Sequence, residues 1–120
     1  MNTIKKESMG FIEEKKSKFY AFLIPYNQFS ERLEYLKNEY PKARHFVTAF
    51  RYLNEYGRVV EGSSDDGEPK GSSGKPSLKV LQGHNLINVA LIVVRFFGGT
   101  LLGVGGLVRA YGDSVNLAIA

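Results

Sequence analysis

The sequence predicts a single α+β domain in which strands and helices follow one another along the chain. Residues 19–24, 44–53 and 86–97 are continuously apolar or alternate with a period of two, as strands do. Other segments repeat apolar residues at the three- and four-residue spacing of a helix. A length of 120 residues, with 43% apolar and 23% charged residues, is ordinary for one globular domain. We therefore expect residues 1–120 to form one domain built from a sheet and packed helices.

The first third of the chain predicts two strands and a helix. Residues 11–14 form a short strand, and a polar turn leads from them into the aromatic and aliphatic strand 19–24. Asn27 is a good N-cap, and the apolar residues after it recur at helical spacing until Pro41 stops the helix. The other face of this helix is charged, so we expect it to face solvent.

The middle of the chain predicts a β-hairpin. Residues 44–53 alternate, with Phe46, Thr48, Phe50 and Tyr52 on one side, and residues 58–61 return as a second strand after a turn. His45 opens the first of these strands, where a hydrogen-bonded structural role competes with a ligand-binding one.

A polar segment at 62–76 follows, without an apolar side chain. Loops of this length inside a compact domain are often functional. Pro76 suits the first turn of a helix through Leu81, and Gly83 suits its C-terminal cap.

The last third predicts a central strand and a final helix. Residues 86–97 are almost all apolar, as expected of a strand covered on both faces. Five glycines within nine residues then open onto a helix, whose expected apolar stripe is Leu107, Val108, Tyr111, Val115, Ala118 and Ile119. Free N–H groups at a helix start and the flanking arginines suit an anion. A tight turn whose glycines only serve packing is the alternative.

The composition excludes several classes of function. Cysteine is absent, which excludes disulfides, thiolate catalysis and cysteine-ligated zinc. No run approaches the ~18 apolar residues of a membrane span, and the N-terminus lacks the apolar core of a secretory signal, so we expect a cytoplasmic protein. A net charge of +4 permits a polyanionic partner without requiring one. Most aromatic residues lie in core-like strands, so no exposed aromatic pattern for reading single strands is expected.

Standard catalytic and nucleotide motifs do not fit this chain. Pro69 and Pro76 break a Walker loop, and Val108 stands where a dinucleotide loop needs its third glycine. The acidic group at 65–68 has hard oxygen ligands for magnesium but lacks calcium-loop spacing, and solvated carboxylates are the alternative. No nucleophile-elbow pattern surrounds a serine.

What remains is two Gly-rich polar loops, at 63–75 and 98–106, each leading into a helix. If they meet at one edge of the sheet, their backbone N–H groups and cations suit phosphate or carboxylate. The alternative is that the arginines pair with the acidic residues and hold the loops together. The candidate anion or nucleic-acid site is Arg95, Arg109, Lys70, Lys75, Gly98, Gly99, Gly103, Gly105 and Gly106.

Both loops carry longer motifs: SDDGEP at 64–69, GSSGKP at 71–76, RFFGG at 95–99 and LGVGGLVRAY at 102–111. These motifs resemble the SDDGEP…GTAGxP and RYFGG…LGxGGLVRAY motifs of the Impact family, whose bacterial members are the YigZ-like proteins. His45 matches the family's AxH position, and KSKF at 16–19 its N-terminal motif, so the resemblance covers 11–120. Departures are Leu101, where many members have lysine, and Ser72 and Ser73, which replace Thr-Ala. The motif residues around the first loop are Ser64, Asp65, Asp66, Glu68 and His45.

The resemblance implies a fold and a biological context. The fold is a two-layer α+β sandwich like the second domain of the small-subunit ribosomal protein five. Longer bacterial relatives add a ferredoxin-like domain that this chain lacks, so we expect the native protein to continue beyond Ala120. Eukaryotic relatives act in translational control by competing for a ribosome-associated activator of an initiation-factor kinase, a pathway that bacteria generally lack.

We expect a non-enzymatic, translation-linked binding module without a cofactor, which contacts RNA or a ribosome-associated protein. The alternative is an enzyme or sensor for a small phosphorylated ligand, with Arg109 on phosphate, the acidic group of the first loop on magnesium and His45 as base. A third reading is a protein-interaction surface whose loops are structural.

Overall fold

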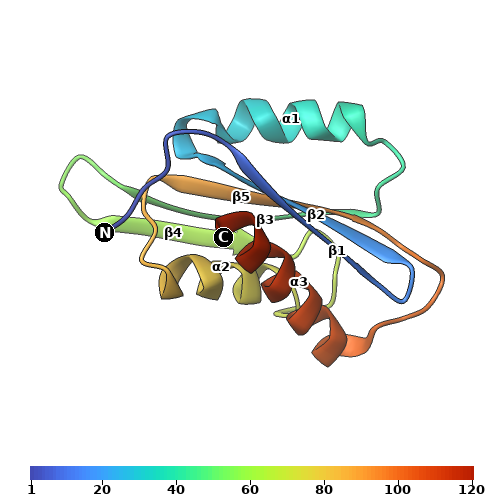
Figure 1. Cartoon of the computed structure of the whole chain (residues 1–120). Coiled ribbons are helices and arrows are strands. Elements are labelled where there is room, and N and C mark those ends of the chain that lie inside the picture. The colour runs from blue at the N-terminus through green and yellow to red at the C-terminus, as the bar shows by residue number, and fades with distance from the viewer.

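The computed structural model describes all 120 residues. Five strands and three α-helices follow one another along the chain, with a short 3₁₀ helix before α1 (Figure 1). In chain order the elements are β1 (Ser8–Glu14), β2 (Ser17–Pro25), η1 (Tyr26–Gln28), α1 (Phe29–Glu39), β3 (His45–Leu53), β4 (Val59–Ser64), α2 (Gly74–Gly83), β5 (Val89–Phe96) and α3 (Gly103–Ile119).

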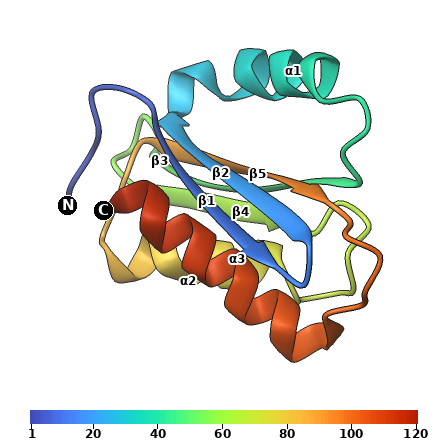
Figure 2. The ribbon, with the colours of Figure 1, turned by 45° about the vertical axis from the view of Figure 1, so that its right-hand side comes forward.

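The strands form one antiparallel sheet in the order β1-β2-β5-β3-β4. Helices α2 and α3 lie side by side on one face, and α1 lies on the other (Figures 1 and 2). Strand β5 is central and buried except at its last residue. The α+β class and the central strand are therefore confirmed.

The alternation of side chains along β5 separates two apolar cores. Val89, Leu91 and Val93 join the core beneath α2 and α3, whereas Ile92 and Val94 join the smaller core beneath α1. The continuously apolar sequence of this strand follows from this double burial. The sheet with α2 and α3 forms the sandwich that the resemblance implied, and α1 covers the opposite face.

Several boundaries differ from the expectations. Asn27 lies within η1, and Gln28 occupies the N-cap of α1 without a side-chain cap bond, so the Asn27 cap is wrong. Strand β4 continues to Ser64 and α2 begins at Gly74, which shortens the irregular loop to 65–73. Val108 is 38% exposed and leaves the apolar stripe of α3. None of the helices combines the length and the hydrophobicity needed to cross a bilayer.

Candidate functional site

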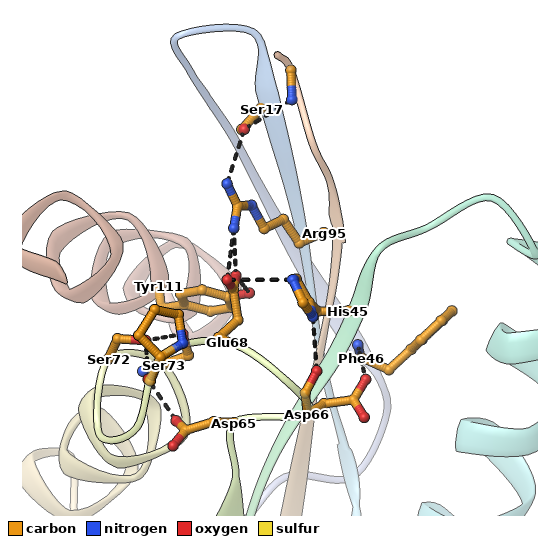
Figure 3. Close-up of polar contacts among 12 residues, drawn as sticks. Ser17, His45, Phe46, Asp65, Asp66, Glu68, Ser72, Ser73, Arg95 and Tyr111 are labelled. Atoms are coloured by element: carbon orange, nitrogen blue, oxygen red, sulfur yellow. Dashed lines mark hydrogen bonds and ion pairs between the residues drawn. The ribbon is translucent and has the colours of Figure 1, made fainter. Parts of the chain in front are cut away.

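Residues of both sequence motifs meet around one buried carboxylate, that of Glu68. Its side chain is 3% exposed and lies between Arg95, at the end of β5, and Tyr111, on α3 (Figure 3). Arg95 Nη1 donates to both carboxylate oxygens, at 2.8 and 2.6 Å, and the Tyr111 hydroxyl donates to Oε2 at 2.6 Å. His45 Nε2 lies 3.4 Å from Oε1. We call Ser17, His45, Glu68, Arg95 and Tyr111 the Glu68 cluster.

Strand register places three members of this region on one face of the sheet. Arg95 pairs with Phe19 of β2 on one side and with His45 of β3 on the other, so all three point toward α2 and α3. The Arg95 Cζ lies 5.4 Å from the centroid of the Phe19 ring and 5.8 Å from that of Phe97. Its Nε is the chain's one buried side-chain polar atom without a hydrogen-bond partner. Aromatic faces therefore surround the guanidinium beside its polar contacts.

Ser17 links the β5–α3 segment to the β1–β2 turn. Its hydroxyl oxygen accepts hydrogen bonds from Arg95 Nη2 at 3.2 Å and from the Gly98 amide at 3.1 Å. A Cβ at Gly98 would overlap the backbone of Lys16 and Ser17. This glycine is needed because two backbones come into direct contact.

Asp65 closes the N-terminus of α2. Its carboxylate accepts hydrogen bonds from the amides of Gly71 at 2.8 Å, Ser73 at 3.2 Å and Gly74 at 2.8 Å. Partial burial works to raise the pKa of Asp65, but these three donors and the nearby Lys75 charge outweigh it and hold the pKa below the ordinary 3.8. Asp65 thus already occupies the Ser73 and Gly74 amides at this helix start, which an anion would otherwise use.

Asp66 fixes the loop to the start of β3. Its Oδ2 accepts a hydrogen bond from the Phe46 amide at 2.7 Å, and its carbonyl oxygen accepts one from His45 Nδ1 at 2.7 Å. Asp66 has a φ of +44° and Gly67 one of +88°, so the chain turns sharply here. All three acidic side chains of the motif thus have partners within the protein, and no three His, Asp or Glu side chains are placed to share a metal ion.

The burial of Arg95 corrects its expected role. Arg95 is 4% exposed and paired with Glu68, so its guanidinium is not presented to an external phosphate. The pairing that the sequence left as an alternative is present for Arg95. Lys70 and Lys75 are exposed, the second in the first turn of α2.

The second glycine cluster is only partly a loop. Gly103, Gly105 and Gly106 belong to the start of α3, so the irregular segment ends at Leu102; Gly99 remains in it, with a φ of +95°. Arg109 is exposed and lines a cavity of about 150 Å³ against the β1–β2 turn. This cavity contains no residue of 63–75, so Arg109 does not share it with Lys70 and Lys75. Its other lining residues are Ile12, Glu14, Lys15, Leu102, Gly106, Ala110 and Asp113.

Sequence reasoning missed two members of the Glu68 cluster. Tyr111 was placed only in the apolar stripe of α3, although a fully buried tyrosine hydroxyl normally needs a partner. Burial raises the pKa of Tyr111, and its hydrogen bond to the Glu68 carboxylate raises it further, so it stays a proton donor. Ser17 lies between two lysines in a polar turn, and nothing local in the sequence marks it as buried.

Comparison with known proteins places the chain in a family. The Impact N-terminal domain matches residues 15–119. An IMPACT family member of Haemophilus influenzae is 44% identical over 97% of this chain, and the IMPACT family member YigZ of Escherichia coli is 41% identical over 89% of it. The chain spans 58% and 54% of the lengths of these two relatives.

Solved structures agree with the fold. A crystal structure of a hypothetical protein superimposes with a TM-score of 0.86 and 38% identity, covering 95% of this chain and 57% of that one. The two-domain translational regulator Yih1 superimposes with a TM-score of 0.60 at 23% identity, covering 99% of this chain and 48% of that one, which is a likeness of fold. With two ordered motifs and nearly the whole chain matched, this protein belongs to the Impact family, through its N-terminal domain.

Proposed function

We propose that this chain is a non-enzymatic binding module of translational regulation, which contacts RNA or a ribosome-associated protein. The observation that supports this most is that charged side chains of the two motifs are bound to each other or to the backbone inside the protein. Arg95 and Glu68 neutralise each other in a buried pair, and Asp65 is occupied by three backbone amides. Groups in such positions shape and stiffen a surface, whereas a general base or a nucleophile must reach its substrate.

The translational context comes from the relatives. Yih1 is described as a two-domain translational regulator, and a Schizosaccharomyces pombe relative, 31% identical over 77% of this chain, is a protein IMPACT homolog. We carry the regulatory context over to this chain as part of the proposal, because it spans about half of these relatives or less.

Exposed cations supply the contacts to the partner in this proposal. Lys70, Lys75 and Arg109 are exposed and have no carboxylate within ion-pair distance. They do not line a common cavity, so they suit a large polyanionic surface better than a small ligand. Contacts of this kind give affinity that falls as the salt concentration rises.

Co-sedimentation with bacterial ribosomes through a sucrose cushion tests the proposal. We expect the protein to pellet with ribosomes at low salt and to be released at high salt. The Lys70→Gln/Lys75→Gln/Arg109→Gln variant should pellet at least fivefold less. The control Lys5→Gln/Lys37→Gln/Lys79→Gln removes the same charge from other exposed positions and should pellet like the parent.

Two results would overturn the proposal. One is an absence of ribosome binding at low salt together with an unchanged yield in a reconstituted translation reaction. The other is a magnesium-dependent rise in melting temperature with a nucleotide, which would favour the sensor or enzyme alternative.

A further inference from the structure

A groove at the ends of β2 and β5, beside the Glu68 cluster, combines aromatic rings with cations that form no ion pair. It is lined by Lys16, Lys18, Tyr20, Phe96 and Phe97, and its volume is about 340 Å³. Lys18 and Phe96 are register partners on β2 and β5, and their side chains share the α1 face with Tyr20. We call these five residues, with Arg44 beside Phe97, the aromatic-basic surface.

The rings of this surface support one another. The ring centroid of Tyr20 lies 6.0 Å from that of Phe96, edge to face, and 4.8 Å from that of Phe11. Phe11 belongs to β1 and is 41% exposed. Tyr40 follows α1 directly. Its ring centroid lies 6.4 Å from that of Tyr20, in a stacked arrangement, and 6.0 Å from that of Phe96. A network of this kind holds its ring faces in place before a ligand arrives, so little conformational entropy is lost on binding.

The cations of this surface are free, in contrast to Arg95. Lys16, Lys18 and Arg44 are exposed and form no ion pair. The Arg44 guanidinium lies over the Phe97 ring, with Cζ 4.6 Å from the centroid. Glu13, opposite Lys18 on β1, is the one carboxylate in register with this surface, so a net positive charge remains.

We propose that the aromatic-basic surface binds single-stranded RNA, with bases stacked on the rings and phosphates on the cations. Ring faces next to unpaired cations match both the bases and the phosphates of a single strand, whereas an acidic peptide would contact only the cations. In a duplex the bases are stacked inside the helix, so no base face is free to stack on the rings. Tyr20 and Phe96 pack against the core beneath α1, as the sequence predicts, but both are only half-buried, and with Phe97 they leave part of their rings open to this groove. The proposal deepens the proposed function and rests on it.

Fluorescence anisotropy with a labelled single-stranded RNA of ten nucleotides tests this surface. We expect binding at least fivefold tighter than to a ten-base-pair RNA duplex at the same salt concentration. The Lys18→Gln/Phe97→Leu variant should bind at least tenfold more weakly, through the loss of one stacking face and one phosphate contact. If Phe97→Leu lowers the melting temperature of the protein, the Lys16→Gln/Lys18→Gln variant replaces it in the test. This variant should lose less affinity for the single strand, and its binding should depend less on the salt concentration.

The matched control is Tyr56→Leu/Lys79→Gln, which removes an aromatic residue that is 78% exposed and a lysine from other parts of the surface. Binding within twofold of the parent is expected for this control. Equal weakening in the control would overturn the proposal, since any exposed ring and charge would then serve equally well.

The two proposals fail differently. Ribosome binding without any binding of the single strand at low salt overturns the aromatic-basic surface and leaves the module to act on a protein. Binding of the single strand that is lost in the Lys70→Gln/Lys75→Gln/Arg109→Gln variant but kept in Lys18→Gln/Phe97→Leu has the same consequence. If the parent protein binds neither ribosomes nor the single strand, the proposed function itself is overturned.

Discussion

Two arginines lie near the ring of Phe97, and their surroundings give them opposite roles. The Cζ of Arg95 is 5.8 Å from the ring centroid and that of Arg44 is 4.6 Å from it. Arg95 is buried and its charge is met by Glu68. Arg44 is exposed and has no carboxylate partner. The comparison shows that burial, and not residue type or proximity to a motif, separates a cation that holds the fold from one that is open to a partner.

The physical reason is the cost of removing a charge from water. A buried guanidinium is tolerated only when a counter-charge and hydrogen bonds replace its hydration, and Glu68 and Ser17 supply these to Arg95. An exposed guanidinium over a ring keeps most of its hydration and gains about 0.5–1 kcal/mol from the contact. Arg44 can therefore exchange water for phosphate at little cost.

The first prediction is that Arg95→Met lowers the free energy of unfolding by about 3–5 kcal/mol, because it leaves the Glu68 charge buried without its cation. Urea unfolding followed by circular dichroism measures this. Arg44→Met is the control and should change the value by less than about 1 kcal/mol, because only its contact with the Phe97 ring is lost. The double variant Arg95→Met/Glu68→Gln should lose less than the sum of the two single variants, since neither partner then remains alone. Equal effects of Arg95→Met and Arg44→Met would remove the distinction between the two arginines.

The second prediction concerns the contact that holds the end of β5 against the β1–β2 turn. Gly98→Ala should cost about 1–3 kcal/mol, because the added methyl group overlaps the Lys16 and Ser17 backbone. Gly112→Ala is the control of opposite sign: nothing lies within 4 Å of its added carbon, and alanine favours the helix by about 0.5–1 kcal/mol. Thermal melts of both variants measure these effects. A neutral Gly98→Ala would show that the two segments are free to separate.

Much of the fold could be predicted from the sequence, because local patterns carry it. The central strand follows from a continuous apolar run, and the start of α2 lies within two residues of the position that Pro76 indicated. The predicted Asn27 N-cap was wrong because Asn27 lies within η1, the turn before α1, where tertiary packing overrides the local preference.

The site was harder to predict because its contacts connect distant positions. Glu68 and Arg95 are 27 residues apart, and Ser17 lies 78 residues before Arg95. The sequence offered several acidic partners for Arg95, and only the register of β3 and β5 with the course of the 65–73 loop selects Glu68. The register of β2 with β5, not composition, brings Lys18, Tyr20 and Phe96 into one groove.

The third prediction uses the lowered pKa of Asp65. A carboxyl group whose pKa is lower in the folded state contributes stability above its unfolded pKa, and this is lost as the pH falls through the folded value. Asp65→Asn should cost about 1–2 kcal/mol near neutral pH, because the three amide donors lose a charged acceptor in a partly solvated position. Below about pH 4 the difference should shrink, since the carboxyl group is protonated first in the unfolded chain and, at still lower pH, in the folded protein. Urea unfolding from pH 7 to pH 3 measures this, and a difference that does not change with pH would contradict the assignment.

The smallest expected effect on stability belongs to Arg44→Gln, which completes the comparison of the two arginines. The variant should leave the free energy of unfolding within about 1 kcal/mol of the parent, because the side chain is exposed and loses only its contact with the Phe97 ring. The same variant should weaken binding of the ten-nucleotide single strand about threefold to tenfold and reduce its salt dependence, since one phosphate contact is lost. Urea unfolding and fluorescence anisotropy on one preparation measure both quantities. Arg95 would then be necessary for stability, and Arg44, beside the same ring, for binding. If Arg44→Gln left binding and its salt dependence unchanged, the free cation beside Phe97 would have no part in recognition, and the contrast between the two residues would reduce to their burial alone.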